Sequence, residues 1–160
     1  MVPELSPERR YAEEAAVVLA AIGLTPAYGK LLGWLLICDP PQQTSGELAA
    51  ALDLSKGSIS TGMRMLERGG FVRRVPVPGR RGHAYEVAPD AIIRSVVEPT
   101  RFRMFRELMD RGVTVAGGPD SSRADRVRIT RDFYAYVERE LPVMVERFKA
   151  EHLGKGEADG

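Results

Sequence analysis

The sequence predicts a mainly α-helical chain that carries one small β-hairpin. Most apolar residues recur at helical spacing, in segments that begin with Ser-Pro or Thr-Pro and end at glycine or proline. Only residues 71–87 change to the short period of extended strands. Two short helices directly precede that stretch, and this order predicts a helix-turn-helix followed by a hairpin wing.

The bulk composition is typical of a folded globular chain, since the 160 residues are 44% hydrophobic and 28% charged. No apolar run approaches the ~20 residues that cross a bilayer, and residues 1–10 lack the layout of a signal peptide. Cys38 is the single cysteine, and with two separated histidines it predicts no disulfide, no metal site and no cofactor. We therefore expect a soluble, cytoplasmic protein without a membrane partner.

The charge is distributed unevenly although the net charge is only +1. Residues 55–83 hold seven Lys and Arg against Glu67 alone, whereas residues 1–54 hold three bases and seven acids. A local positive surface of this kind is typical of a chain that binds a polyanion. Residues 94–131 are also basic, but their charges alternate in sign as on a solvated helix face.

Two helices are predicted before residue 40. They begin at Ser6-Pro7 and Thr25-Pro26, pairs that supply a capping hydroxyl and a proline suited to the first helical position. Gly23 stops the first helix. The second is apolar almost all round, so we expect it to form the buried centre of the fold.

The next two helices have helix-turn-helix spacing. Thr44–Glu47 fits a capping box in front of a short helix that ends near Asp53. Ser55 then caps a fourth helix that runs to Arg68 and is closed by a double glycine. Strands are predicted at Phe71–Val75 and Ala84–Val87, with a turn-rich loop between them that forms the tip of the wing.

The remainder of the chain is predicted to be helical. One segment opens at Pro89-Asp90, bends at Pro99 and reaches about Gly112. Residues 117–120 break the chain, and Ser121 or Ser122 caps a last helix that runs to about Lys149. Its apolar positions alternate steps of three and four, as in a heptad seam: Val127, Thr130, Tyr134, Val137, Leu141, Met144 and Phe148.

This seam has two interpretations. A stripe of this kind usually indicates packing within a core, and Pro142 favours a kink within the helix. The winged domain already has its own core, so we favour a dimerisation arm. The predicted organisation is an N-terminal helix in the dimer interface (1–24), a winged helix-turn-helix domain (25–88), C-terminal dimerisation helices (89–153) and a disordered tail (154–160).

The fourth helix separates into two faces on a helical wheel. One face is apolar and is expected in the core, and the other is small, hydroxyl-rich and cationic. A solvated surface would explain Arg and Ser, but it gains nothing from Gly57, and Glu67 is the only acid on the helix. The predicted DNA-binding residues are Ser55, Lys56, Gly57, Ser58, Ser60, Thr61, Arg64, Arg68, Arg73, Arg80 and Arg81.

The wing adds cations to this face. Arg80 and Arg81 lie between two glycines, a setting that suits insertion into a narrow minor groove, although an ordinary exposed hairpin tip would have similar residues. Arg73 and Arg74 point to opposite faces of their strand, so we expect only one of them to reach a phosphate.

Two runs resemble the MarR superfamily of winged helix regulators: SGELAAALDLSKGSIS from Ser45 and MRMLERGGFV from Met63. The preceding GLTP, GKLLGWLL and Pro40-Pro41 resemble its GbsR branch, and the pattern covers residues 8–90. The resemblance implies a dimer joined through the first and last helices, with two recognition helices on a pseudo-palindromic operator. It also implies transcriptional control, usually repression, which a small molecule sometimes relieves.

Regulators of the GbsR type are associated with choline and glycine betaine metabolism. Aromatic residues can form a cation–π cage for a quaternary ammonium ion, although they more often pack in a core. The candidates for such an effector pocket are Tyr28, Trp34, Phe102, Phe105, Phe133 and Tyr134.

Other functional classes fit the sequence less well. It has no Gly-rich phosphate loop, no Ser/His/Asp arrangement that can be placed together and no metal cluster, so we expect no enzyme activity. RNA binding fits less well, since the sequence lacks the exposed pairs of aromatic residues on strands that stack on single-stranded bases. We predict a sequence-specific, double-stranded DNA-binding repressor that acts as a homodimer and responds to a small-molecule effector. The alternative is a winged-helix module that binds a protein partner without specific DNA binding.

Overall fold

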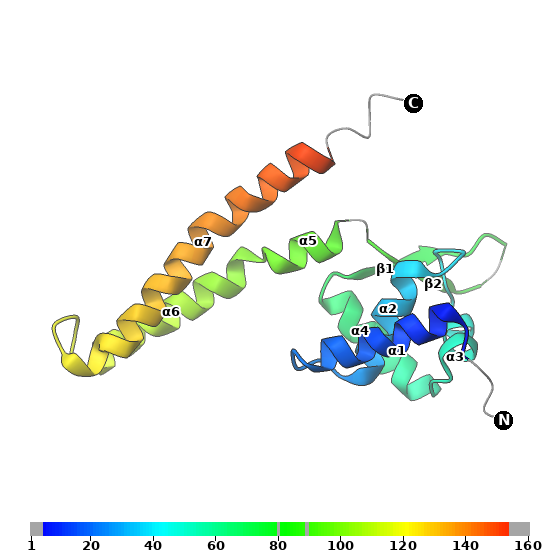
Figure 1. The fold of residues 1–160 in the computed structure, drawn as a ribbon, viewed down its shortest axis with the longest axis horizontal. Coiled ribbons are helices and arrows are strands. Elements are labelled where there is room, and N and C mark those ends of the chain that lie inside the picture. Colours follow the sequence, from blue (N-terminus) through cyan, green and yellow to red (C-terminus); the bar gives the residue numbers. More distant parts are fainter. Residues whose placement is uncertain (1–4, 80, 89, 154–160) are drawn as a thin grey trace. The chain divides into compact units, whose positions relative to one another are not determined.

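The computed structural model describes residues 5–79, 81–88 and 90–153 (Figure 1). They fall into two compact units, Met1–Ser95 and Val96–Gly160, and each is described by itself. The predicted class, mainly α-helical with one β-hairpin, is confirmed, and the hairpin lies in the first unit. The predicted tail at 154–160 lies outside the described residues.

The first unit begins with α1 (Pro7–Ala20) and α2 (Pro26–Ile37), which start where the proline pairs predict. Ser6 and Thr25 are the N-caps, and each hydroxyl accepts a backbone N–H of the first turn at 3.3 Å. Gly23 turns the chain between the helices with a φ of 91°, a conformation that glycine adopts without strain.

Small residues allow α1 and α2 to pack closely. A Cβ atom on Gly33 would lie 2.4 Å from the Cβ of Ala15, and one on Gly29 would lie 2.8 Å from the Cα of Ala16. The helix predicted for the dimer interface is thus also part of the first unit's packing, through one of its faces. The division between the units falls after Ser95, whereas the predicted boundary was residue 88.

The second helix lies at the centre of the core of the first unit, where Leu31 is fully buried. Leu36 and Ile37 are exposed in the last turn of α2. The prediction that this helix forms the buried centre of the fold is thus confirmed, although its last turn leaves these two side chains uncovered.

The helix-turn-helix consists of α3 (Ser45–Leu52) and α4 (Lys56–Arg68). The predicted capping box is present: the Glu47 N–H donates to Thr44 Oγ1 at 3.2 Å, and the Thr44 N–H donates to Glu47 Oε2 at 2.7 Å. Asp53 ends α3 in the left-handed conformation, with a φ of 52°. The short turn that follows leads into α4.

The wing is the antiparallel pair β1 (Val72–Pro76) and β2 (His83–Val87), with Val72 opposite Val87 and Pro76 opposite His83. The first strand begins one residue later than predicted, because the Phe71 N–H bonds to the Leu66 carbonyl at 2.9 Å and closes the end of α4. The second begins one residue earlier, since His83 pairs with Pro76.

Gln43 connects the segment before α3 to the wing. Its backbone exchanges two hydrogen bonds with Tyr85, at 2.9 and 2.8 Å. Its side chain accepts from Trp34 Nε1 at 3.4 Å and donates to the Pro40 carbonyl at 2.8 Å. Gln43 is buried, and these bonds satisfy its polar groups and hold β2 against the helical core.

Beyond the wing, the chain forms the short helix α5 (Ala91–Val96) and then α6 (Pro99–Val115). The predicted bend at Pro99 is a break between two helices, since proline suits a first helical position better than a helix interior. The predicted helix end was at about Gly112, but α6 continues to Val115 and Gly112 lies within it. A Cβ atom on Gly112 would lie 2.9 Å from Cγ1 of Val127, so the glycine permits close helix packing.

Gly117 and Gly118 turn the chain after α6 with φ angles of 102° and 92°. Ser121 caps the short 3₁₀ helix η1 (Ser122–Ala124) rather than the long helix predicted there. That long helix, α7 (Asp125–His152), follows η1 without a side-chain cap of its own.

The second unit contains the antiparallel pair α6 and α7 (Figure 1). Arg106 Nε donates to Glu138 Oε2 at 2.7 Å and joins the two helices, and the helix α7 continues through Pro142. The buried core of this unit is small. Its buried cluster consists of Val113, Ala116 and Ala124, with Val127 packed against them, and Val145 is buried further along α7.

Candidate nucleic-acid interface

The first turn of α4 is organised by Ser55. Its Oγ accepts the Ser58 N–H at 3.1 Å and also donates to Ser58 Oγ at 3.0 Å. Both hydroxyls were predicted to bind DNA, and in the free protein they bond to each other. The cap fixes the start of the helix, where the positive end of the helix dipole lies beside the exposed side chain of Lys56.

The two faces of α4 are those that the helical wheel predicts. The buried face consists of Ile59, Gly62, Met63 and Leu66. The exposed face consists of Lys56, Gly57, Ser60, Thr61, Arg64 and Arg68, together with Met65, which is 40% exposed. Two adjacent positions are chemically coupled, because Arg64 Nη2 donates to Ser60 Oγ at 3.4 Å. Among the residues that the structure describes, no carboxylate pairs with Arg64 or Arg68. This face therefore presents hydroxyls and unneutralised guanidinium groups to the outside.

The two glycines of α4 differ in surroundings. A Cβ atom on Gly62 would lie 2.4 Å from Leu31 Cδ1, so this glycine has a packing role in the core. A Cβ atom on Gly57 would meet only Ser55 Oγ, at 3.9 Å. Nothing in the free protein therefore excludes a side chain at position 57.

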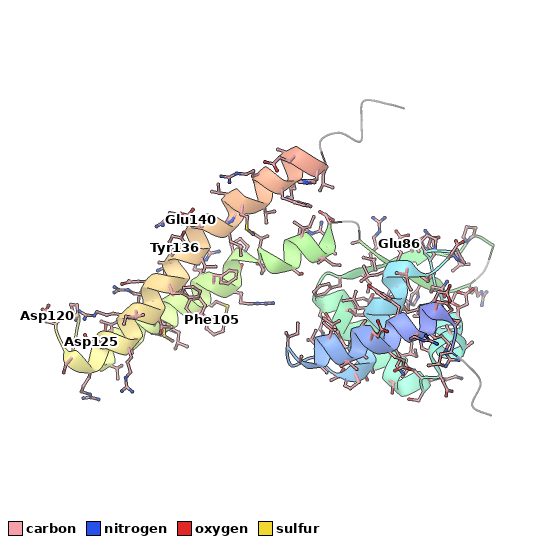
Figure 2. All side chains as sticks on the ribbon, viewed as in Figure 1. Glu86, Phe105, Asp120, Asp125, Tyr136 and Glu140 are labelled. Atoms are coloured by element: carbon pink, nitrogen blue, oxygen red, sulfur yellow. The ribbon has the colours of Figure 1, made fainter. Side chains whose placement is uncertain are left out.

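Arg73 on β1 pairs across the hairpin with Glu86 on β2, with Nη2 2.6 Å from Oε1. Gln42 donates to the other oxygen of Glu86 at 2.6 Å. The hydrogen bonds from Gln42 and then Arg73 hold the pKa of Glu86 below its usual range. Arg73 stays a predicted DNA contact. Its guanidinium is paired with Glu86, which Figure 2 labels, but 61% of the Arg73 side chain is exposed.

Arg74, the neighbouring base, pairs instead with Glu67 on α4, and its hydrogen bonds to that carboxylate raise the pKa of Arg74. The two arginines thus point to opposite sides of β1, as predicted. At the tip of the wing, Arg81 is exposed beside Gly82, which has a φ of 115°. Arg80 lies outside the described residues.

The six candidate effector residues fall into two groups, one in each unit. In the first unit, Tyr28 is buried edge-on against Phe71 at 6.2 Å between ring centroids, and burial raises the pKa of Tyr28. Trp34 bonds to Gln43. Both residues therefore have packing roles in the winged core.

In the second unit, Tyr134 stacks on Phe105 at 5.1 Å between centroids. Phe102 and Phe133 lie at 6.5 and 5.8 Å from the same ring. A ring stacked on another ring has one face fewer to offer a cation. The aromatic cage stays a prediction, and in the chain by itself the three phenylalanine rings each lie beside Tyr134.

The described residues contain neither a metal site nor a membrane-spanning helix. No group of three or more His, Cys, Asp or Glu side chains there could hold a metal ion. No helix in the same ranges is both long enough and apolar enough to cross a membrane.

The ion pair between Glu67 and Arg74 was missed by sequence reasoning. The signals were present, since Glu67 is the only acid in residues 55–83 and Arg74 faces away from Arg73. What the sequence did not supply was the packing of β1 against the last turn of α4, which brings the two side chains together.

Comparisons with known proteins agree with this geometry. Residues 22–81 match the MarR family, and residues 90–151 match the MmpR5-like MarR family transcriptional regulators. The chain is 38% identical over 141 residues to the HTH-type transcriptional regulator MmpR5 of Mycobacterium tuberculosis (strain ATCC 25618 / H37Rv), covering 86% of this chain and 84% of that protein. The chain belongs to the MarR family of transcriptional regulators.

A solved structure described as the crystal structure of a transcriptional regulator resembles this MarR-family chain. Its TM-score is 0.76 at 36% sequence identity, and the match covers 88% of this chain and 97% of that one. The protein is therefore a DNA-binding transcriptional regulator with a winged helix fold, and its family is one of regulators rather than enzymes. The resemblance to the GbsR branch stays a prediction.

Proposed function

We propose that this regulator binds a two-fold symmetric DNA operator as a homodimer and represses transcription from it. The observation that carries the proposal is the exposed face of α4, where hydroxyl and guanidinium groups lie together and Glu67, the one acid of the helix, is turned toward Arg74. Because the proposed partner is chromosomal DNA, we place the protein in the cytoplasm, with no catalytic role.

The chemistry of this face fits a major groove. The groove is wide enough for an α-helix, and a small residue such as Gly57 lets the backbone approach the DNA closely. Arg64 lies in the middle of the face, where a guanidinium can donate two hydrogen bonds to guanine. Lys56 at the helix start and Arg81 on the wing are placed to contact phosphates or the neighbouring minor groove.

The homodimer is supported by apolar surface that one chain leaves uncovered. On α7, Ile129 and Phe133 are 72% and 60% exposed, and Tyr136 lies on the side turned away from α6 (Figure 2). On α1, Val17 and Val18 are also exposed, opposite the face that packs on α2. Exposed apolar surface on this scale is typical of an interface, and a second copy of the chain offers the same surfaces for a symmetric contact.

The test is in-vitro selection of random duplex DNA on the purified protein, with affinity measured at two salt concentrations. We expect a two-fold symmetric motif whose half-sites lie roughly 34 Å apart, one turn of the double helix, because a dimer presents two copies of α4. Binding should weaken steeply as salt rises, since Lys and Arg contacts release counterions from phosphates.

Selection of no motif, with weak binding that disappears near physiological salt, would contradict the operator proposal. A basic surface would then remain, and a protein partner for the winged domain would become the better interpretation. Repression is tested separately by placing the selected motif over a promoter, where addition of the protein should reduce transcription.

A further inference from the structure

An ion pair joins α4 to the wing. Arg74 Nε donates to Glu67 Oε1 at 2.6 Å and Arg74 Nη2 donates to Glu67 Oε2 at 3.0 Å, so the guanidinium grips both carboxylate oxygens. The Glu67 side chain is only 23% exposed. Two parallel hydrogen bonds fix the relative orientation of the groups, which a single contact would not do.

The guanidinium of Arg74 is also held by the second strand. Its Cζ lies 5.8 Å from the centroid of the Tyr85 ring, which is buried. The Tyr85 hydroxyl lies 3.0 Å from Nε2 of His83, and its backbone is bonded to Gln43. Arg74 thus links the last turn of α4 to both strands of the wing and, through Tyr85, to the segment before α3.

The position of this pair matters more than its contribution to stability. Exposed ion pairs stabilise folded proteins little, and half of the Arg74 side chain is exposed. The pair nevertheless lies between the two elements that are proposed to enter DNA. It also holds the only acid of residues 55–83, and that carboxylate would otherwise oppose phosphate binding.

We infer that Glu67 and Arg74 are positioning residues for DNA recognition. They fix the angle between α4 and the wing, so that Arg64 can reach base edges while Arg81 reaches the neighbouring groove of the same half-site. The inference rests on the proposed DNA contacts of these two arginines. Neither Glu67 nor Arg74 itself contacts DNA.

The sign of one measurement separates this role from plain electrostatics. Replacing Glu67 by glutamine removes a negative charge near DNA, so charge alone predicts tighter binding to every duplex. A positioning role predicts the opposite for the selected motif, because a wing whose angle to α4 is less tightly fixed must be ordered when both contacts form. Affinity for random duplex should stay the same or increase.

The experiment compares the unsubstituted chain with Glu67→Gln, Arg74→Gln, the double variant and the control Glu86→Gln. The control removes a carboxylate that also pairs with an arginine, but both partners of that pair lie within the wing. Each variant is titrated with the selected motif and with random duplex at several salt concentrations. Thermal unfolding of each variant verifies that it is folded.

We expect Glu67→Gln and Arg74→Gln each to weaken binding to the selected motif by roughly threefold to tenfold. The double variant should lose no more affinity than the single variant that binds the motif less tightly, because coupled residues act as one unit. Glu86→Gln should bind the motif as well as the original protein or better.

Three outcomes would overturn the inference. Glu67→Gln could bind the motif and random duplex more tightly in parallel, which leaves only a charge effect. Both variants could bind the motif unchanged, which leaves a surface ion pair. Arg74→Gln could weaken both DNAs and lower the salt slope by about one, which makes Arg74 a phosphate contact. Arg64→Ala is measured beside them: if it weakens binding to the motif while Glu67→Gln does not, the DNA-binding proposal stands and the positioning role alone fails.

Discussion

The two units of the chain bury their apolar residues to very different extents. In the first unit, helices α1 to α4 and both strands share one core, in which Leu31, Leu48, Ile59, Met63 and Leu66 are almost completely buried. In the second unit, the buried cluster consists of Val113 and two alanines, and Val145 is buried separately on α7. Helices α6 and α7 are nevertheless longer than any helix of the first unit.

The difference indicates a division of labour. A unit with a closed core has a defined shape in one chain, and such a scaffold can hold a recognition helix and a wing at fixed positions. A pair of long helices with few buried side chains gains most of its stability by covering its apolar faces. We therefore expect the first unit to read DNA and the second to join two chains.

The largest effect should follow from charges placed on the exposed apolar face of α7. We expect the double variant Ile129→Asp and Phe133→Asp to be monomeric, because carboxylates cannot be buried unpaired in an interface. Affinity for a two-half-site operator should fall by a factor on the order of a hundred or more, since the second half-site is no longer tethered. Sedimentation velocity and DNA titration measure the two losses.

Asp132→Ala is the control for this variant, because Asp132 is an exposed acid on the same helix, between the two altered positions. It should leave both the dimer and its affinity intact. A doubly substituted protein that still sediments as a dimer would refute the role given to this face of α7.

A cavity in the first unit should have the next largest effect. Leu66→Ala removes a side chain that is 0% exposed, and we expect it to lower the free energy of unfolding by about 2–5 kcal/mol. Leu108→Ala, at a position 48% exposed on α6, should shift the equilibrium between monomer and dimer instead. Thermal unfolding at several protein concentrations distinguishes them, because only the second effect depends on concentration. If the change in unfolding temperature depended on protein concentration equally in both variants, the proposed difference between the two units would be wrong.

The first unit could be predicted from sequence to a large extent because its signals are local. The caps Ser6, Thr25, Thr44 and Ser55 each satisfy a backbone donor within three residues, so their helices begin where the pattern indicates. The apolar face of α4 was predicted by the same local geometry. Errors of one residue occurred at the strands, where pairing across the hairpin decides the ends.

Other features depend on contacts between distant residues and could not be predicted. Gly112 was expected near the end of a helix, but it lies against Val127 on α7 of the same chain, and nothing near it in sequence indicates that contact. The pairing of Arg74 with Glu67 likewise requires the packing of β1 on α4. The choice between core packing and a dimer arm for α7 depends on whether a second copy of the chain covers its exposed face, which no periodicity specifies.

Within the first unit, the reading face can be separated from the scaffold by Arg64→Ala. We expect it to leave unfolding almost unchanged, because Arg64 is exposed and lies outside the core. Binding to the selected motif should weaken by about 1–3 kcal/mol, with relaxed preference at one base pair, if the guanidinium makes two bonds to guanine. Repeating the selection with the variant measures the preference. A uniform loss at unchanged preference would instead assign Arg64 to a phosphate.

The smallest expected effect is at Gly57, and it has opposite signs in the free and bound states. A Cβ atom at this position meets only Ser55 Oγ at 3.9 Å, so Gly57→Ala should stabilise the free protein by about 0.4–1 kcal/mol through the loss of unfolded-state freedom. The same methyl group would lie between α4 and the DNA. Binding to the selected motif should therefore weaken, although the protein unfolds at a higher temperature.

Gly46→Ala is the matched control, because Gly46 occupies the same second position of α3 and is equally open, with Thr44 Oγ1 at 4.0 Å. It should give a similar gain in stability without the loss in affinity, since α3 is not proposed to enter the groove. If Gly57→Ala instead binds the motif as tightly as the original protein, the backbone at residue 57 does not approach the DNA closely. The DNA-contacting surface of α4 would then begin at Ser60, and Gly57 would lower the stability of the first unit without a function in DNA recognition.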